Sequence, residues 1–121
     1  MTDVRAAGNL LSQMCYQASL DAGWWDGIDC QDIYVVCTKL ALVHSEISEA
    51  LEGARKGIND DHLPARLMLE VELADAVIRI ADLAGALGLD LGGAIADKMV
   101  YNAQRLDHKR EVRAGALGKK V

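Results

Sequence analysis

The chain has 121 residues, which is enough for one domain and too few for two. Its 51% hydrophobic and 26% charged residues exclude a disordered tail, and an aromatic content of 4% with no phenylalanine argues against a β-sandwich or barrel. The net charge of −5 at pH 7 argues against a nucleic-acid binder, since such proteins neutralise phosphates with lysine and arginine.

Apolar residues that recur every three or four positions predict a series of helices. The first helix is closed by Gly23, after which a turn-rich loop carries Trp24 and Trp25. Gly57 provides a C-cap for the second helix, and Asp90 provides an N-cap for the fourth. We expect helices at residues 4–21, 33–56, 65–87 and 91–109, followed by a basic tail at residues 110–121.

Two of these helices carry long apolar stripes that we expect to form the core. The stripe on the second helix contains Leu40, Val43, Ile47, Leu51 and Ala54. The stripe on the third helix contains Leu69, Leu73, Ala76, Ile80, Leu83 and Leu87. Since no strand-like alternation interrupts the helices, the predicted fold class is all-α, a four-to-five-helix bundle in which residues 1–109 form a single domain.

Two pairs of carboxylates accompany the stripes. Glu46 and Glu49 are three residues apart on the second helix, and Glu72 and Asp75 repeat this spacing on the third, so each pair shares one helix face. If the stripes pack together, four acids meet near a helix interface, where their repulsion requires a proton, a basic partner or a divalent cation. An all-oxygen set without histidine suits Mg²⁺ or Mn²⁺ better than zinc.

Plainer interpretations of the acids stay open. Each pair taken alone fits a solvated helix face. Arg79, four residues after Asp75, would form an ordinary salt bridge with it. Asp82, seven residues after Asp75, falls on nearly the same face and would support the ligands from outside.

Charge is divided unevenly along the chain. Residues 1–97 contain 6 Lys and Arg against 16 Asp and Glu, whereas residues 98–121 contain 7 against 2. A polar and basic stripe on the fourth helix contains Lys98, Asn102, Arg105 and Lys109. Such a stripe either faces solvent or clamps the phosphates of a ligand whose other contacts are made by a metal.

Three segments carry a family resemblance: KLALVHSEISEALE at residues 39–52, ELADAVIRIADLAGALGLD at residues 72–90, and KMVYN at residues 98–102. Together they resemble the MazG-like all-α nucleoside triphosphate pyrophosphohydrolases, particularly the short phage and bacterial members. The family pattern is Glu-Glu-x-x-Glu followed by Glu-x-x-Asp, and the two acid pairs match it with 22 residues between them, although its first Glu is Ser45 here. The resemblance covers about residues 33–109, and the RLDHKR and GKK segments that follow Gln104 are similar to the phage-type members.

This resemblance implies Mg²⁺-dependent cleavage of a (deoxy)nucleoside triphosphate, such as dGTP or GTP, to the monophosphate and pyrophosphate by a homodimer or homotetramer. The metal-binding and catalytic residues would be Glu46, Glu49, Glu72 and Asp75. The substrate-binding residues would be Lys98, Asn102, Arg105, Trp24 and Trp25. One of the acids, or Asp82, would take the proton of the attacking water, and Arg79 would support the ligands.

Several functional alternatives remain. Related enzymes of this type act on phosphoribosyl-ATP, dCTP or dUTP, and a helical interaction module with a basic tail would need no catalysis. Trp24 and Trp25 would either stack on the base or close the end of the bundle.

The three cysteines, Cys15, Cys30 and Cys37, lack CxxC spacing and predict buried, reduced thiols. No apolar run approaches about 18 residues, which is the length needed to cross a membrane. The chain also has no signal-peptide pattern, so we expect a cytoplasmic protein that does not enter membranes.

Overall fold

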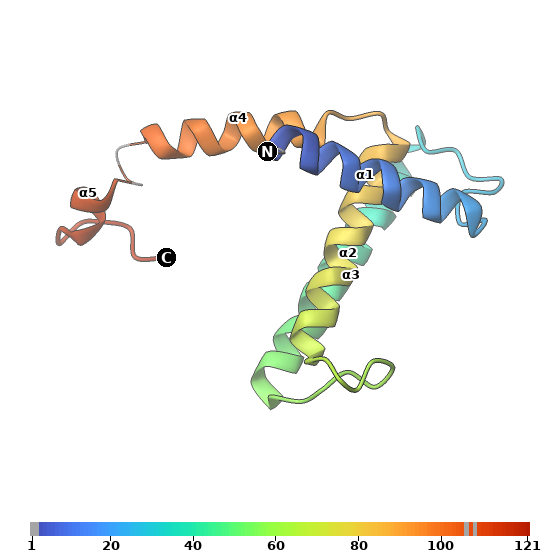
Figure 1. Cartoon of the computed structure of the whole chain (residues 1–121), viewed down its shortest axis with the longest axis horizontal. Coiled ribbons are helices and arrows are strands. Elements are labelled where there is room, and N and C mark those ends of the chain that lie inside the picture. The colour runs from blue at the N-terminus through green and yellow to red at the C-terminus, as the bar shows by residue number, and fades with distance from the viewer. Residues whose placement is uncertain (1–2, 106, 108) are drawn as a thin grey trace. The chain divides into compact units, whose positions relative to one another are not determined.

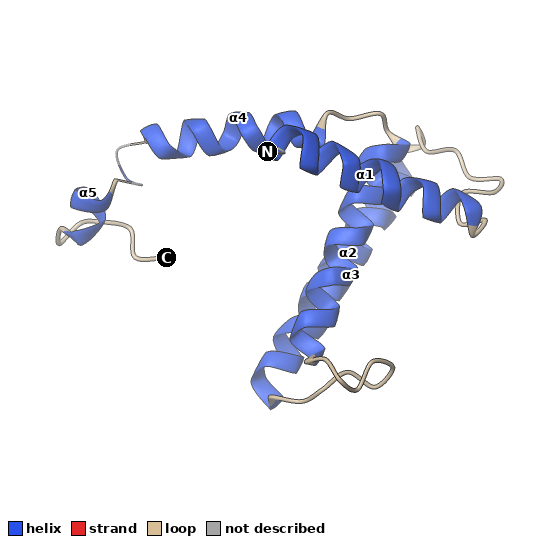
Figure 2. Ribbon diagram, viewed as in Figure 1, coloured by secondary structure: helices blue, strands red, loops and turns tan. Residues whose placement is uncertain are grey.

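The structure is a computed structural model that describes residues 3–105, 107 and 109–121, and the described chain is all-helical (Figures 1 and 2). Its helices are α1 (Val4–Asp21), α2 (Ile33–Lys56), α3 (Met68–Ala86), α4 (Leu91–Gln104) and α5 (Arg110–Ala114). The predicted all-α class is confirmed. Among the described residues, no helix is both long enough and apolar enough to cross a membrane.

The helix bounds agree with the sequence pattern at α1 and α2 and differ from it elsewhere. Helix α3 begins three residues later than predicted, and α4 ends at Gln104 rather than at Lys109. Arg105 has an extended backbone, with φ −69° and ψ 135°, and its guanidinium donates to Asp107 at 2.7 and 3.1 Å. The predicted tail contains the short helix α5, while Leu106 and His108 of the predicted fourth helix lie outside the described residues.

The chain divides into two compact units, one formed by Leu10–Leu89 and the other by Met1–Asn9 with Asp90–Val121. The first unit contains most of α1 together with α2 and α3, and the candidate site lies in it. The second unit contains the start of α1 together with α4 and α5.

Helices α2 and α3 run side by side along their lengths, as Figure 1 shows, but much of each leucine stripe is exposed. Apart from Leu83, the buried residues of the pair are small or acidic and include Glu46, Ala50, Gly53, Glu72 and Ala76. Small side chains let two helix backbones approach closely, and residues such as Ala50, Gly53 and Ala76 allow this between α2 and α3.

The prediction that the leucine stripes form the core is therefore largely wrong for this chain. Ala76 and Leu83 are buried as expected, whereas Leu40, Ile47, Leu51, Leu73 and Ile80 are each more than 40% exposed. Small and acidic residues therefore supply most of the buried positions on α2 and α3.

Helix α1 is fixed against α3 by a close approach. Ser12 is buried and its Oγ donates to the carbonyl of Ala81 at 2.8 Å. Gly85 lies directly under Tyr16, where the Cβ of any larger residue would overlap the tyrosine. The sequence places this glycine near the end of α3, and its lack of a side chain permits the crossing.

The loop between α2 and α3 explains the late start of α3. Helix α2 ends at Gly57, whose φ of 62° is the left-handed conformation that glycine adopts without strain. The buried side chain of Asp60 then accepts hydrogen bonds from the amides of His62 and Leu63, at 2.9 and 2.8 Å. These bonds hold the chain in a turn that extends past Pro64 and delays the helix.

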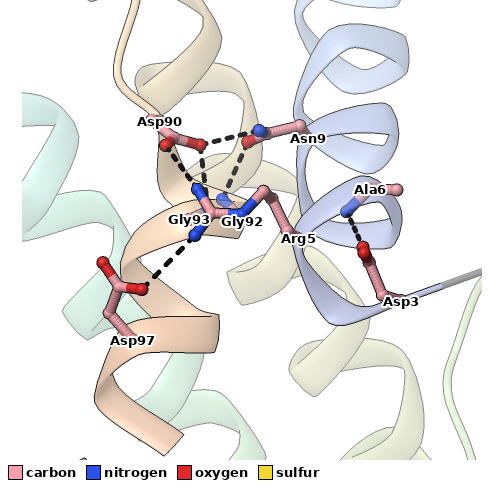
Figure 3. Close-up of polar contacts among 8 residues, drawn as sticks. All are labelled: Asp3, Arg5, Ala6, Asn9, Asp90, Gly92, Gly93 and Asp97. Atoms are coloured by element: carbon pink, nitrogen blue, oxygen red, sulfur yellow. Dashed lines mark hydrogen bonds and ion pairs between the residues drawn. The ribbon is translucent and has the colours of Figure 1, made fainter. Parts of the chain in front are cut away.

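In the other unit, Asp90 caps α4 as predicted (Figure 3). Its Oδ1 accepts from the amide of Gly93 at 2.9 Å and from Asn9 Nδ2 at 2.7 Å, and Arg5 pairs with Oδ2 at 3.1 Å. The Asn9 and Gly93 hydrogen bonds, helped by the charge of Arg5, lower the pKa of Asp90. This cluster joins the start of α1 to the start of α4.

Candidate functional site

Three carboxylates from α2 and α3 converge between these helices. Glu46 on α2 and Glu72 and Asp75 on α3 place one oxygen each within 4.8 Å of one another, a spacing that could hold a metal ion. Glu46 and Glu72 are both 8% exposed, and Asp75 is half-buried. Three of the four predicted metal ligands are thus brought together.

One oxygen of this triad lacks a partner. Oε2 of Glu72 is buried and receives no hydrogen bond from the described residues. A buried acceptor without a donor is costly, so this oxygen favours a proton or a bound cation.

Burial and repulsion shift the acids toward their neutral forms. Burial raises the pKa of Glu72 to about 8, helped by hydrogen bonding and repulsion from Glu46 and Glu49. Burial and the charge of Glu46 also raise the pKa of Asp75, against the opposing charge of Arg79. These shifts are the response expected when several carboxylates share one site without a counterion.

The fourth predicted ligand, Glu49, lies at the edge of the triad. Glu49 is exposed, and it is not among the three carboxylates whose oxygens lie within 4.8 Å of one another. It nevertheless raises the pKa of Glu72 through a hydrogen bond and through charge. Glu49 therefore faces Glu72 from the solvent side of the cluster.

Arg79 forms an ion pair, but with a different acid from the one its spacing indicated. Its Nε donates to Oε1 of Glu46 at 2.9 Å, across the two helices, rather than to Asp75 on its own helix. The pair fixes the orientation of the Glu46 carboxylate, and neither Glu72 nor Asp75 forms an ion pair with any described residue.

A cavity of about 620 Å³ adjoins the triad within the Leu10–Leu89 unit. This volume is in the range of small-molecule sites, roughly 300–1,000 Å³. Glu46, Asp75 and Arg79 line it on the acidic side. Its remaining wall is largely apolar and includes Leu11, Met14, Ala18, Trp24 and Ile78.

A second group of polar residues surrounds Asp82, which lies seven residues after Asp75 on α3. Asp82 accepts from Ser19 Oγ at 3.0 Å with one oxygen and from Trp25 Nε1 at 2.9 Å with the other. The ammonium of Lys39 lies 4.6 Å from the centre of the Trp25 ring. Both Asp82 oxygens are therefore occupied by donors, and Asp82 orients Trp25.

The two tryptophans occupy different environments. Trp25 is 8% exposed, and Tyr16 packs edge-on against it at 6.4 Å between ring centres. Trp24 is 68% exposed and lines the cavity. Trp24 thus offers an exposed ring to the cavity that Glu46 and Asp75 also line, whereas Trp25 is enclosed by its neighbours.

The predicted phosphate-binding residues Lys98, Asn102 and Arg105 belong to the other unit. Lys98 lies over the ring of Tyr101 at 4.4 Å, and Oδ1 of Asn102 is buried with no partner among the described residues. Because α4 ends at Gln104, Arg105 and Lys109 do not continue a helical stripe. The single basic stripe expected along residues 98–109 is therefore wrong beyond Asn102.

Lys39 and Ser19 are among the lining residues that the sequence did not indicate as part of the site. Lys39 precedes Glu46 by seven residues, two helical turns, so the spacing alone places both on one face of α2. Ser19 reaches Asp82 from α1, and no spacing within either helix could have indicated that contact.

No family model, curated protein or solved structure matches the chain. The site itself defines a class: three converging carboxylates, one of them with an unpartnered buried oxygen, beside a cavity with an apolar and aromatic wall. Hard divalent cations prefer such oxygen ligands, and they commonly bind phosphates at the same time.

Proposed function

We propose that this protein is a Mg²⁺-dependent nucleoside triphosphate pyrophosphohydrolase of the MazG-like all-α type. The reaction converts a (deoxy)nucleoside triphosphate and water to the monophosphate and pyrophosphate. The observation that carries the proposal is the unpartnered Oε2 of Glu72, buried in a triad whose other members line a cavity large enough for a small molecule.

The donor set fits a hard cation. All the converging atoms are carboxylate oxygens, and burial together with the negative charge of the neighbouring acids raises the pKa values of Glu72 and Asp75. A divalent ion would compensate that negative charge. Glu46, Glu72 and Asp75 would hold Mg²⁺ or Mn²⁺, with Glu49 at the solvent edge. When bound, the ion would supply Lewis acidity toward phosphate oxygens.

Residues of the chain would orient the ligands, bind the base and take up the proton. Arg79 holds the Glu46 carboxylate in place, and Trp24 offers a surface on which a base would stack. A carboxylate of the cluster would take the proton from the attacking water as the bond between the α and β phosphates breaks. The phosphate-binding role of Lys98, Asn102 and Arg105 stays a prediction from the sequence, because these residues belong to the other unit.

Purine triphosphates, including dGTP and GTP, are our first candidates for the substrate. Phosphoribosyl-ATP, dCTP and dUTP are the alternatives, and a panel assay with Mg²⁺ or Mn²⁺ separates them by the nucleotide that yields monophosphate and pyrophosphate. Salt-sensitive retention of DNA without any turnover would instead favour an interaction module.

We also propose that the working protein is a homodimer or homotetramer. Leu40, Ile47 and Leu51 form an exposed apolar stripe on α2, and Leu73 and Ile80 continue an exposed stripe on α3. A second copy of the chain offers the same stripes and would cover them, as homo-oligomer contacts do.

The test compares two acids on one helix. We expect Asp75→Asn to reduce Mg²⁺-dependent pyrophosphate release at least a hundredfold, with an unchanged helical circular dichroism spectrum, because a neutral amide is a poor ligand for the cation. Glu70→Gln is the matched control, since Glu70 is exposed and pairs with Arg66 at 2.9 Å. Full turnover by Asp75→Asn would contradict the site assignment.

A further inference from the structure

Lys39 lines the cavity together with Glu46 and Asp75 of the acidic triad, and its role follows from its position there. It lies two turns before Glu46 on α2, about 10 Å along the helix axis. Its ammonium rests on the Trp25 ring at 4.6 Å, a distance at which a cation is attracted by the ring face.

No carboxylate among the described residues pairs with this ammonium. Asp82 lines the same cavity, but its two oxygens already accept from Ser19 and Trp25. Arg79, the other cation lining the cavity, is committed to Glu46. Lys39 also makes no hydrogen bond to a described residue, so its three N–H donors are available to a group that enters the cavity.

We propose that Lys39 binds a phosphate oxygen of the substrate and so forms the second anchor of its polyphosphate chain. The inference rests on the proposed function, in which the triad and its cation form the first anchor. Lysine binds phosphate as a point charge with three donors. Contact with Trp25 limits the rotamers of the long side chain before the ligand arrives, which reduces the entropy lost on binding.

The chemical class of the ligand follows from charge. A neutral base has only a weak electrostatic attraction to an ammonium. A phosphate chain would be attracted at both ends, by a cation at the triad and by Lys39. Inorganic tripolyphosphate is therefore the decisive probe, because it carries the phosphate chain and has no base or sugar.

The experiment uses the full chain and two titrations by calorimetry. The first measures Mn²⁺ binding, and the second measures tripolyphosphate binding in saturating Mn²⁺. We compare the wild type with Lys39→Met, which keeps an apolar stem over Trp25, and with Lys39→Arg, which keeps the charge and stacks on indole. Lys56→Met is the matched control on the same helix, since Lys56 is exposed and pairs with Glu52 at 3.2 Å.

We expect Lys39→Met to bind Mn²⁺ as the wild type does and to lose about tenfold in tripolyphosphate affinity, the loss typical of one charged hydrogen bond. Lys39→Arg should recover most of that affinity, and Lys56→Met should match the wild type. If Lys39→Met loses its near-ultraviolet spectrum, Lys39→Gln replaces it, with the same tenfold loss expected.

Equal tripolyphosphate affinity in the folded neutral variant would overturn the inference while leaving the proposed function intact. A loss seen only with a nucleoside triphosphate would also overturn it and would place Lys39 at the base. Absence of Mn²⁺ binding by the wild type would refute the proposed metal site instead.

Discussion

The Glu72 carboxyl is protonated over a pH range in which an ordinary glutamate is charged. Its pKa is about 8 in the folded chain, against an ordinary value of 4.5, because it is buried beside Glu46 and Glu49. Between these values the folded chain binds a proton that the unfolded chain releases. The free energy of unfolding of the metal-free protein therefore falls as pH rises from about 4.5 to about 8.

Replacement of Glu72 by glutamine should remove this pH dependence in large part. We expect Glu72→Gln to be more stable than the wild type at pH 8 in the presence of EDTA, and the difference to shrink toward pH 5. Urea denaturation across this pH range measures both quantities. Glu70→Gln should keep the slope of the wild type, and an equal slope in Glu72→Gln would show that another group titrates.

Sequence spacing predicted the two acid pairs because residues three apart share one face of a helix. The separation of Glu72 from Asp75 fixes a shared face whatever the tertiary structure. The choice of Glu46 as the partner of Arg79 could not be predicted in this way, since it depends on how α2 and α3 align. The enclosure of Trp25 by Lys39 and Tyr16 likewise joins three separate segments.

At the scale of elements, periodicity predicted the helices, and side-chain size decided how they pack. Two helix ranges were correct because caps and glycines marked their ends. The expected burial of the α2 leucines was wrong, because the buried residues of α2 are Glu46, Ala50 and Gly53. A close approach of backbones through small residues leaves a weak signal in a hydrophobic pattern.

The turn between α2 and α3 should depend on one of two adjacent aspartates. Asp60 is 7% exposed and accepts two amide hydrogen bonds, whereas Asp61 is exposed. We expect Asp60→Ala to lower the free energy of unfolding by about 2 kcal/mol, the typical loss for bonds to a charged acceptor. Thermal and urea denaturation provide the measurement.

Asp61→Ala is the control for this change. It should stay within about 0.5 kcal/mol of the wild type, as surface substitutions usually do. Equal stabilities of the two variants would mean that the turn forms without the Asp60 bonds.

For the whole molecule, the exposed stripes predict assembly. We expect light scattering to give the mass of a dimer or tetramer for the wild type, and a monomer for Ile47→Glu combined with Leu51→Glu. The reason is that two buried charges in an apolar contact are costly to desolvate. Ser48→Glu, at an exposed neighbouring position, should leave the mass unchanged. A monomeric wild type at micromolar concentration would contradict the proposed assembly.

The small residues between α2 and α3 restrict how this sequence can evolve. Ala50 and Ala76 are each 3% exposed and set the spacing of the two helices that carry the acids. A larger side chain at either position would push the helices apart and with them the carboxylates, so selection for the chemistry also acts on two residues that have no chemistry of their own. The exposed leucines of the two stripes do not set the spacing of the helices, so they can be replaced by other apolar residues that keep their contacts.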